Sequence, residues 1–158
     1  MSADSLDEAL RGIDRVLLDT STLLAFHGQH EAAHPLAKRI LGRIEDALDP
    51  LRGYYSVVSA TELLVRPLRA GPTETAYMHA FLRSFPNLSL LPVDLDVASQ
   101  AATLRAIKNL KTPDALIVAG GILAGCQAII TNDGAWKTKM EPLFREFRWV
   151  YLGGHQRP

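Results

Sequence analysis

Residues 112–133, TPDALIVAGGILAGCQAIITND, decide the fold class. Residues 115–132 carry no charge, and this length is close to the roughly 18 residues at which a membrane-spanning helix becomes a candidate. Three glycines interrupt the run, and its pattern changes in the middle. A buried helix over residues 113–124 that leads into a buried strand over residues 128–131 therefore explains the stretch better than a membrane span.

The remaining hydrophobic patterns alternate short strands with helices. They predict further strands over residues 15–18, 54–58, 88–91 and 148–152. They predict further helices over residues 20–26, 35–48, 59–68, 74–85 and 95–110. Short apolar strands separated by helices are typical of a parallel sheet covered on both faces. We therefore predict an α/β fold, a three-layer sandwich whose central, mostly parallel sheet has four to five strands.

The chain length favours one main domain with short additions. Its 158 residues are enough for a single domain with a full hydrophobic core. Apolar residues recur at helical spacing within residues 1–14, which are expected to form an N-terminal extension with a short helix. Residues 15–152 then form the main domain, and residues 153–158 form a flexible tail.

Charge and cysteine content indicate in which compartment the protein resides and which classes of partner it binds. The 17 basic and 17 acidic residues cancel, so the net charge alone does not indicate a nucleic-acid binder. The start of the chain is acidic and lacks the apolar core of a signal peptide. The single cysteine, Cys126, excludes an internal disulfide and fits a reducing compartment. We therefore expect a cytoplasmic protein without a membrane span.

Acidic residues fall at the ends of the predicted strands, where open α/β sheets bind their ligands. Asp19 follows the first strand, Glu62 lies just past the second, and Asp133 lies just past the fourth. Asp114 lies in the first turn of the buried helix, whose start can face the same edge of the sheet. The four carboxylates are therefore expected to share one recess.

Each of these acidic residues also has a purely structural explanation. Glu62 completes a capping box that begins at Ser59. Asp114 suits the first turn of a helix that Thr112 would cap. The other two carboxylates suit a helix cap and an Asn-Asp-Gly turn.

The four residues taken together favour a metal site. Carboxylates that lie close together in a poorly solvated recess repel one another, so they must take up protons or bind a cation. Oxygen ligands without His or Cys suit Mg²⁺ or Mn²⁺ rather than zinc. A cation of this kind in a cleft at the strand ends indicates phosphoryl-transfer chemistry.

Four short motifs carry a family resemblance. In chain order they are VLLDTS (16–21), SATEL (59–63), TPDALI (112–117) and ITND (130–133). The ordered set resembles the four motifs of PIN-domain ribonucleases, over about residues 15 to 140. The resemblance implies metal-assisted hydrolysis of RNA, with one or two Mg²⁺ or Mn²⁺ ions held by Asp19, Glu62, Asp114 and Asp133.

The resemblance also implies supporting residues and partners. The matched motifs suggest that Thr20 or Ser21, and Thr131 or Asn132, hydrogen-bond the carboxylates. Many family members of this size are toxins of the VapC type, which an antitoxin peptide holds inactive and which are often dimeric. The extension over residues 1–14 departs from the commonest small toxins. A toxin role, an antitoxin partner and a homodimer are therefore expectations from the resemblance.

Basic residues flank the predicted recess. Without the four site carboxylates, 17 basic residues remain against 13 acidic ones (17 minus 4). The residues that could contact RNA phosphates are Arg66, Arg69, Lys108, Lys111, Lys137 and Lys139. For any single one of them, ordinary solvated surface charge is the favoured explanation.

Other functions remain open at this point. A catalytically inactive PIN-like module that binds RNA or a protein is the nearest alternative. A phosphatase with Asp19 as its nucleophile would need a second acid two residues on, where Ser21 stands. His27, His30 and His34 have helix-like spacing, but no cysteine accompanies them, so a solvated or RNA-facing loop is favoured over a zinc site.

Overall fold

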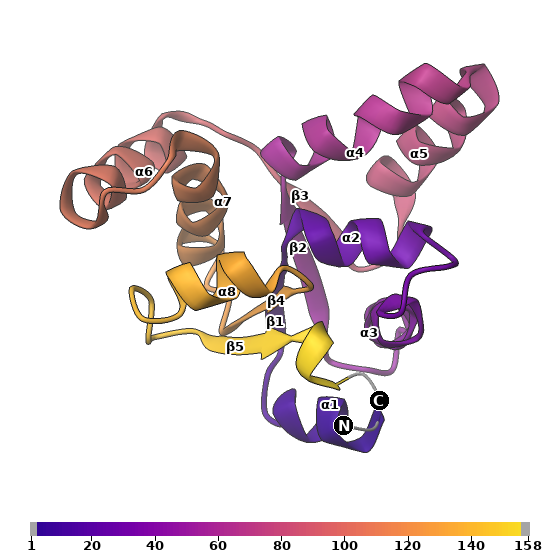
Figure 1. Ribbon diagram of the computed structural model, residues 1–158, viewed down its shortest axis with the longest axis horizontal. Coiled ribbons are helices and arrows are strands. Elements are labelled where there is room, and N and C mark those ends of the chain that lie inside the picture. The colour runs from indigo at the N-terminus through magenta and orange to yellow at the C-terminus, as the bar shows by residue number, and fades with distance from the viewer. Residues whose placement is uncertain (1–2, 156–158) are drawn as a thin grey trace.

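The computed structural model describes residues 3–155, which form one sheet between two layers of helices (Figure 1). All neighbouring strands pair in parallel, in the order β3-β2-β1-β4-β5. The strands are β1 (Arg15–Leu18), β2 (Arg52–Ser56), β3 (Leu88–Leu91), β4 (Ala128–Thr131) and β5 (Arg148–Tyr151). The predicted α/β sandwich is confirmed, and the sheet is parallel throughout.

The helices occupy most of the remaining chain. They are α1 (Ala3–Ala9), α2 (Thr20–His27), α3 (His34–Glu45), α4 (Val57–Ala70), α5 (Pro72–Ser84), α6 (Leu95–Lys108), α7 (Thr112–Leu123), α8 (Gly134–Met140) and a terminal 3₁₀ helix, η1 (Leu152–His155). Residues 156–158 of the expected tail lie outside the described part of the chain. Within that part, no helix is both long and apolar enough to cross a membrane.

The alternation of side chains along the strands divides the interior into two cores. Val16 and Leu18 of β1 are fully buried in the core that α1, α2, α3 and α5 cover. Leu17, between them, is fully buried in the core that α6 and α7 cover. This alternation is the period of two that a strand imposes on its side chains.

Helix α7 lies unusually close to the sheet. A Cβ atom added to Gly121 would stand 2.7 Å from Cδ2 of Leu17, which is too close for any real contact. Glycine at this position therefore lets the helix approach β1, and it explains why small residues fill the middle of the uncharged stretch. The close approach also sets how near to the sheet the start of α7 lies.

Two predicted helix caps are wrong. The second strand ends at Ser56, whose hydroxyl accepts a hydrogen bond from the backbone N–H of Val58 and caps α4. The capping box predicted from Ser59 is therefore wrong, since α4 begins at Val57. The predicted cap at Thr112 is also wrong, because Lys111 holds that position.

Helices α4 and α5 pack against each other and project beyond the sheet (Figure 1). At the base of this pair His27 lies among aromatic rings, with its centroid 4.4 Å from that of Phe81. Its Nε2 atom is buried without a hydrogen-bond partner, and burial lowers the pKa of His27 to about 4. The expectation of a solvated loop is therefore wrong for this histidine, which is a packing residue.

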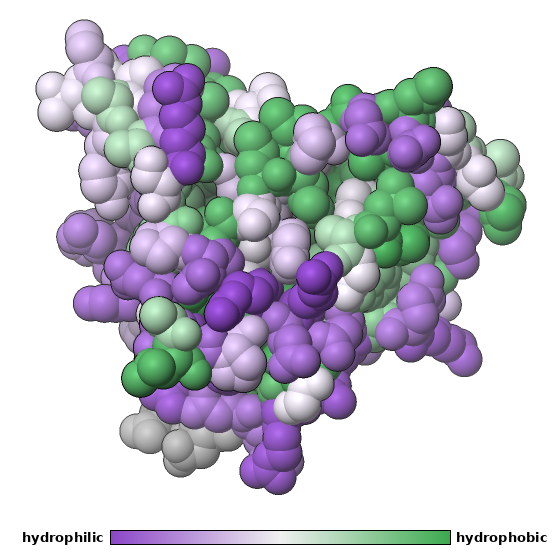
Figure 2. Space-filling view, turned by 180° about the vertical axis from the view of Figure 1, so that it is seen from behind, coloured by the Kyte–Doolittle hydropathy of each residue, from purple (hydrophilic) through white to green (hydrophobic). Residues whose placement is uncertain are grey.

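The opposite side of the molecule exposes apolar residues. Figure 2 shows hydrophobic residues gathered on the upper half of the face seen from behind. Strand β3 is an edge strand of the sheet. The exposed residues from β3 and the segment after it are Leu90, Val93 and Leu95. This face lies away from α8.

Candidate active site

The strand topology places three of the four predicted acidic residues along one edge. All strands run parallel, so their carboxyl ends meet there. Asp19 directly follows β1, and its backbone N–H donates to the carbonyl of Ile130 in β4 at 3.0 Å. Asp133 lies two residues past β4, and Glu62 is on α4, which follows β2 directly.

Asp114 approaches the same edge from the other direction. Helix α7 leads into the start of β4 and therefore runs opposite to the strands. Its first turn, which contains Asp114, points toward the carboxyl ends of the sheet. A carboxylate in the first turn also interacts favourably with the helix dipole.

Asp19 is a buried carboxylate held by hydroxyl groups. Its side chain is only 7% exposed. Oδ2 accepts hydrogen bonds from Ser21 Oγ at 2.7 Å and from Thr131 Oγ1 at 2.8 Å. Burial raises the pKa of the Asp19 carboxyl above its usual range, and the hydrogen bonds from these hydroxyls and from nearby backbone N–H groups offset only part of that effect. Within residues 5–153 no ion pair compensates its charge.

Thr131 joins the ends of β1 and β4 into one network. Its hydroxyl donates to Asp19 and accepts a hydrogen bond from the backbone N–H of Asp133 at 3.0 Å. Ser21 accepts from the backbone N–H of Asn132 at 2.8 Å, so Asn132 contributes its backbone rather than its side chain. These bonds fix Asp19 and the start of α8 relative to each other.

Asp133 caps α8. Its Oδ1 accepts hydrogen bonds from the backbone N–H groups of Ala135 at 2.9 Å and Trp136 at 3.0 Å. The predicted Asn-Asp-Gly turn is therefore the start of a seven-residue helix. This cap leaves the second carboxylate oxygen without a hydrogen bond among the described residues.

Both oxygens of Asp114 contact α8. Oδ2 lies 2.9 Å from Nζ of Lys139, and Oδ1 accepts a hydrogen bond from Nε1 of Trp136 at 3.1 Å. The ring of Trp136 in turn packs edge-on against Trp149, with centroids 5.5 Å apart. Asp114 is thus neutralised by a cation from the chain itself, unlike Asp19.

Glu62 is exposed on α4, and no hydrogen bond or ion pair joins it to the other carboxylates within the described residues. The start of its helix is held from the Asp19 side, because Thr20 Oγ1 donates to Ser59 Oγ at 2.9 Å in a buried contact. Thr20 therefore positions α4 rather than a carboxylate. The structure brings Asp19 and Asp133 into one network and places Asp114 against α8, but it leaves Glu62 apart.

The donors fit a hard divalent cation in their chemistry, but they are not gathered as a finished ligand set. Asp19 offers buried oxygen to a cation and lacks a compensating charge. Among the described residues, however, no three His, Cys, Asp or Glu side chains are grouped closely enough to hold an ion. In addition, the ammonium group of Lys139 occupies one oxygen of Asp114.

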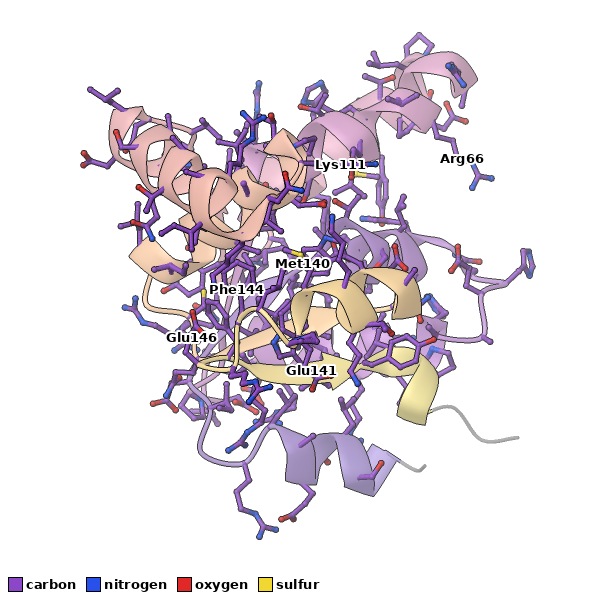
Figure 3. All side chains as sticks on the ribbon, turned by 60° about the vertical axis from the view of Figure 1, so that its left-hand side comes forward. Arg66, Lys111, Met140, Glu141, Phe144 and Glu146 are labelled. Carbon is purple, nitrogen blue, oxygen red and sulfur yellow. The ribbon has the colours of Figure 1, made fainter. Side chains whose placement is uncertain are left out.

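The basic residues divide into two groups. Lys108 donates to the carbonyl of Leu143 at 2.6 Å, Lys137 pairs with Glu141 at 2.8 Å, and Lys139 is bound to Asp114. Within the described residues, no hydrogen bond or ion pair holds the other three, which are Arg66, Arg69 and Lys111. Figure 3 shows Arg66 pointing outward from the α4–α5 pair and Lys111 at the start of α7.

Sequence reasoning missed the role of α8 in this site. Lys139 was expected to contact RNA phosphates, but it binds Asp114, and so does Trp136 from the same helix. A usable signal was present, since residues three apart on a helix lie on the same face. The helix itself went unrecognised because it spans only seven residues.

Comparison with known proteins gives a consistent result. The family model described as the PIN domain matches residues 16–139 of this chain. None of the curated proteins matches it. The resemblance seen in the four sequence motifs is confirmed by the family match.

Several solved structures share the fold. A toxin–antitoxin complex from Klebsiella pneumoniae is 19% identical, with a TM-score of 0.63, and the match covers 87% of this chain and 97% of that one. Mycobacterium tuberculosis VapC20, a sarcin–ricin loop cleaving toxin, is 24% identical with a TM-score of 0.59, over 78% and 93% of the two chains. Rickettsia felis VapBC2, bound to a promoter DNA fragment, is 13% identical with a TM-score of 0.61, over 87% and 98%.

Proposed function

Because this chain belongs to the PIN domain family, a family of nucleases, we propose that it is a metal-dependent endoribonuclease that hydrolyses phosphodiester bonds in RNA. The observation that carries the proposal is Asp19, a buried carboxylate at the carboxyl end of β1 without a cationic partner in the described structure. A buried charge of this kind costs stability unless a cation compensates it. A cation bound beside Asp19 would remove that cost.

Asp19 and Asp114 are the residues that would hold Mg²⁺ or Mn²⁺, with Glu62 and Asp133 as further ligands for one or two ions. When bound, the ion activates water for attack and neutralises charge that develops on the phosphate. Ser21 and Thr131 fix the orientation of the Asp19 carboxylate through their hydroxyls. No Ser, Cys or His nucleophile is required.

Three unpaired cations are proposed to position the RNA. Arg66 and Arg69 on α4 and Lys111 before α7 have no partners among the described residues, so their charges are available to phosphate groups. Contacts with phosphates place RNA without reading its sequence. Lys108 donates to a backbone carbonyl within the protein, which makes it less available for this role.

We further propose a toxin role with an antitoxin partner, in the cytoplasm. The support is that structures sharing the fold include toxin–antitoxin complexes. An Arg from the partner would match the carboxylate of Asp19 or Asp114 through two parallel hydrogen bonds. Growth arrest on induction, relieved by a small protein encoded next to this chain, is the expected result. A homodimer is part of the same proposal.

A catalytically inactive module that binds RNA or protein is the second candidate. The ion pair between Asp114 and Lys139 favours it, because a site that never takes up metal would be stable in this form. Cleavage of RNA by the wild type separates the two candidates.

The decisive assay incubates purified protein with structured and unstructured RNAs in Mn²⁺ or in chelator. The nuclease predicts cleavage in Mn²⁺, none in chelator, and a loss of at least about 100-fold in Asp114→Asn. Asp96→Asn is the matched control, since Asp96 is an exposed carboxylate in the first turn of α6 and outside the site. RNA binding without cleavage by the wild type would favour the inactive module.

A further inference from the structure

Lys139 stands where a site built for a divalent cation would need open space. Its Nζ lies 2.9 Å from Oδ2 of Asp114, and Trp136 occupies Oδ1 of the same carboxylate. Asp114 therefore has a cation already, while Asp19 has none among the described residues. Two carboxylates at one sheet edge thus differ in whether a cation of the protein neutralises them, and this difference calls for an explanation.

The two contacts to Asp114 differ in how firmly α8 holds them. Trp136 is fixed by its packing against Trp149, and the helix start is fixed by the Asp133 cap. Lys139 is 42% exposed, and its flexible stem gives the ammonium group an open route to water. An exposed ion pair of this kind is weak, so it can open readily.

We propose that Lys139 is a tethered competitor for the metal: its ammonium group occupies Asp114 in the metal-free protein and must leave before a divalent cation binds there. This inference rests on the proposed function, since it concerns the same site. An ammonium group and a divalent ion at the same carboxylate oxygen repel each other, so the presence of one disfavours the other. Lys139 thus acts through Asp114 as a positioning residue and lowers the affinity for metal.

The other lysine of α8 provides a matched control. Lys137 lies two residues away on the same short helix and pairs with Glu141 instead of with Asp114. Substituting it changes the charge of α8 equally but leaves the Asp114 contact intact. Any difference in metal affinity between the two variants is then due to the Asp114 contact rather than to the net charge.

The test is a calorimetric titration of the full chain with Mn²⁺, with tryptophan fluorescence as a second readout because Trp136 touches Asp114. Lys139→Met is expected to bind Mn²⁺ about tenfold more tightly than the wild type, and Lys137→Met less than threefold more tightly. Lys139→Arg keeps the charge and is expected to stay near the wild type. In an Asp114→Asn background, Lys139→Met should no longer change the affinity.

The outcomes separate the two proposals. Equal or weaker Mn²⁺ binding by Lys139→Met, with normal binding by the wild type, would overturn the competitor role and leave the nuclease proposal standing. No Mn²⁺ binding by either protein would overturn both. Thermal unfolding without metal shows that each variant is folded, and Lys139→Met should lie close to the wild type there because the ion pair is exposed.

Discussion

Replacing Asp19 with asparagine should make the metal-free protein more stable. Asp19 is 7% exposed, and its carboxylate accepts hydrogen bonds from neutral hydroxyl and backbone N–H groups. The amide oxygen of asparagine can still accept the hydrogen bonds from Ser21 and Thr131. The substitution therefore removes a buried charge and keeps the acceptor.

The size of the effect follows from two opposing contributions. Burying an ion costs several kcal/mol, and hydrogen bonds to a charged group return about 1.5–3 kcal/mol each. We expect Asp19→Asn to raise the free energy of unfolding by about 1 kcal/mol at pH 7. For a domain of this length that corresponds to a rise in Tm of about 2–4 °C.

The gain should depend on pH in a defined direction. Burial raises the pKa of Asp19 in the folded state above its unfolded value. Wild-type stability is therefore complete below the unfolded pKa and is lost as the pH rises through the folded pKa. The advantage of Asp19→Asn should be absent in acid and grow toward neutral pH.

The assay is urea unfolding of both proteins between pH 3 and 8 in chelator. Asp49→Asn is the control with the opposite sign, because Asp49 pairs with Arg43 at 2.8 Å and that hydrogen bond lowers the pKa of Asp49. Asp49→Asn should lower the free energy of unfolding by about 1 kcal/mol at pH 7. Destabilisation by Asp19→Asn at pH 7 without metal would refute the claim that this charge is uncompensated.

Three further results are expected. Gly121→Ala should lower the free energy of unfolding by about 1–3 kcal/mol, because its Cβ would meet the sheet. Gly42→Ala in α3 should raise it by up to about 1 kcal/mol, because nothing lies within 4 Å of the added Cβ. Denaturant unfolding measures both, and equal effects would count against the close packing of α7. Since the folded pKa of His27 is about 4, stability should fall as the pH drops from about 6.5 to 4, and His27→Phe should remove that slope in acid titrations. Lys111→Met should weaken RNA binding and lower its salt dependence by about one charge, whereas Lys108→Met should not, because Lys108 is bound to a backbone carbonyl. Filter binding measures both affinities. A larger loss of RNA affinity in Lys108→Met than in Lys111→Met would contradict the proposed RNA path.

Most of the fold could be predicted because its signals are local. The strands over 88–91 and 128–131 have their predicted bounds, since short apolar runs are bordered by residues that break strands. The helix after the second strand was placed too late, because Val57 and Val58 suit a strand and only the Ser56 cap makes them helical. The β propensity of these two residues favours a longer strand there, but the Ser56 cap determines where the helix starts.

The site was less predictable because it depends on contacts between distant segments. The sequence placed Asp19 at a strand end, but nothing local showed that Ser21 and Thr131 would share its Oδ2. Asp114 and Lys139 are 25 residues apart, and their pairing depends on how α8 packs against α7. A basic residue near an acidic site can bind substrate or neutralise the acid, and spacing alone does not separate the two.

Diffraction from crystals soaked in Mn²⁺, recorded for the anomalous signal of manganese, tests the central claim most directly. We expect a peak in contact with the carboxylates of both Asp19 and Asp114, with the Lys139 ammonium group moved away from Asp114. An empty site at saturating Mn²⁺, or manganese bound only elsewhere, would contradict the claim that these carboxylates form a metal centre.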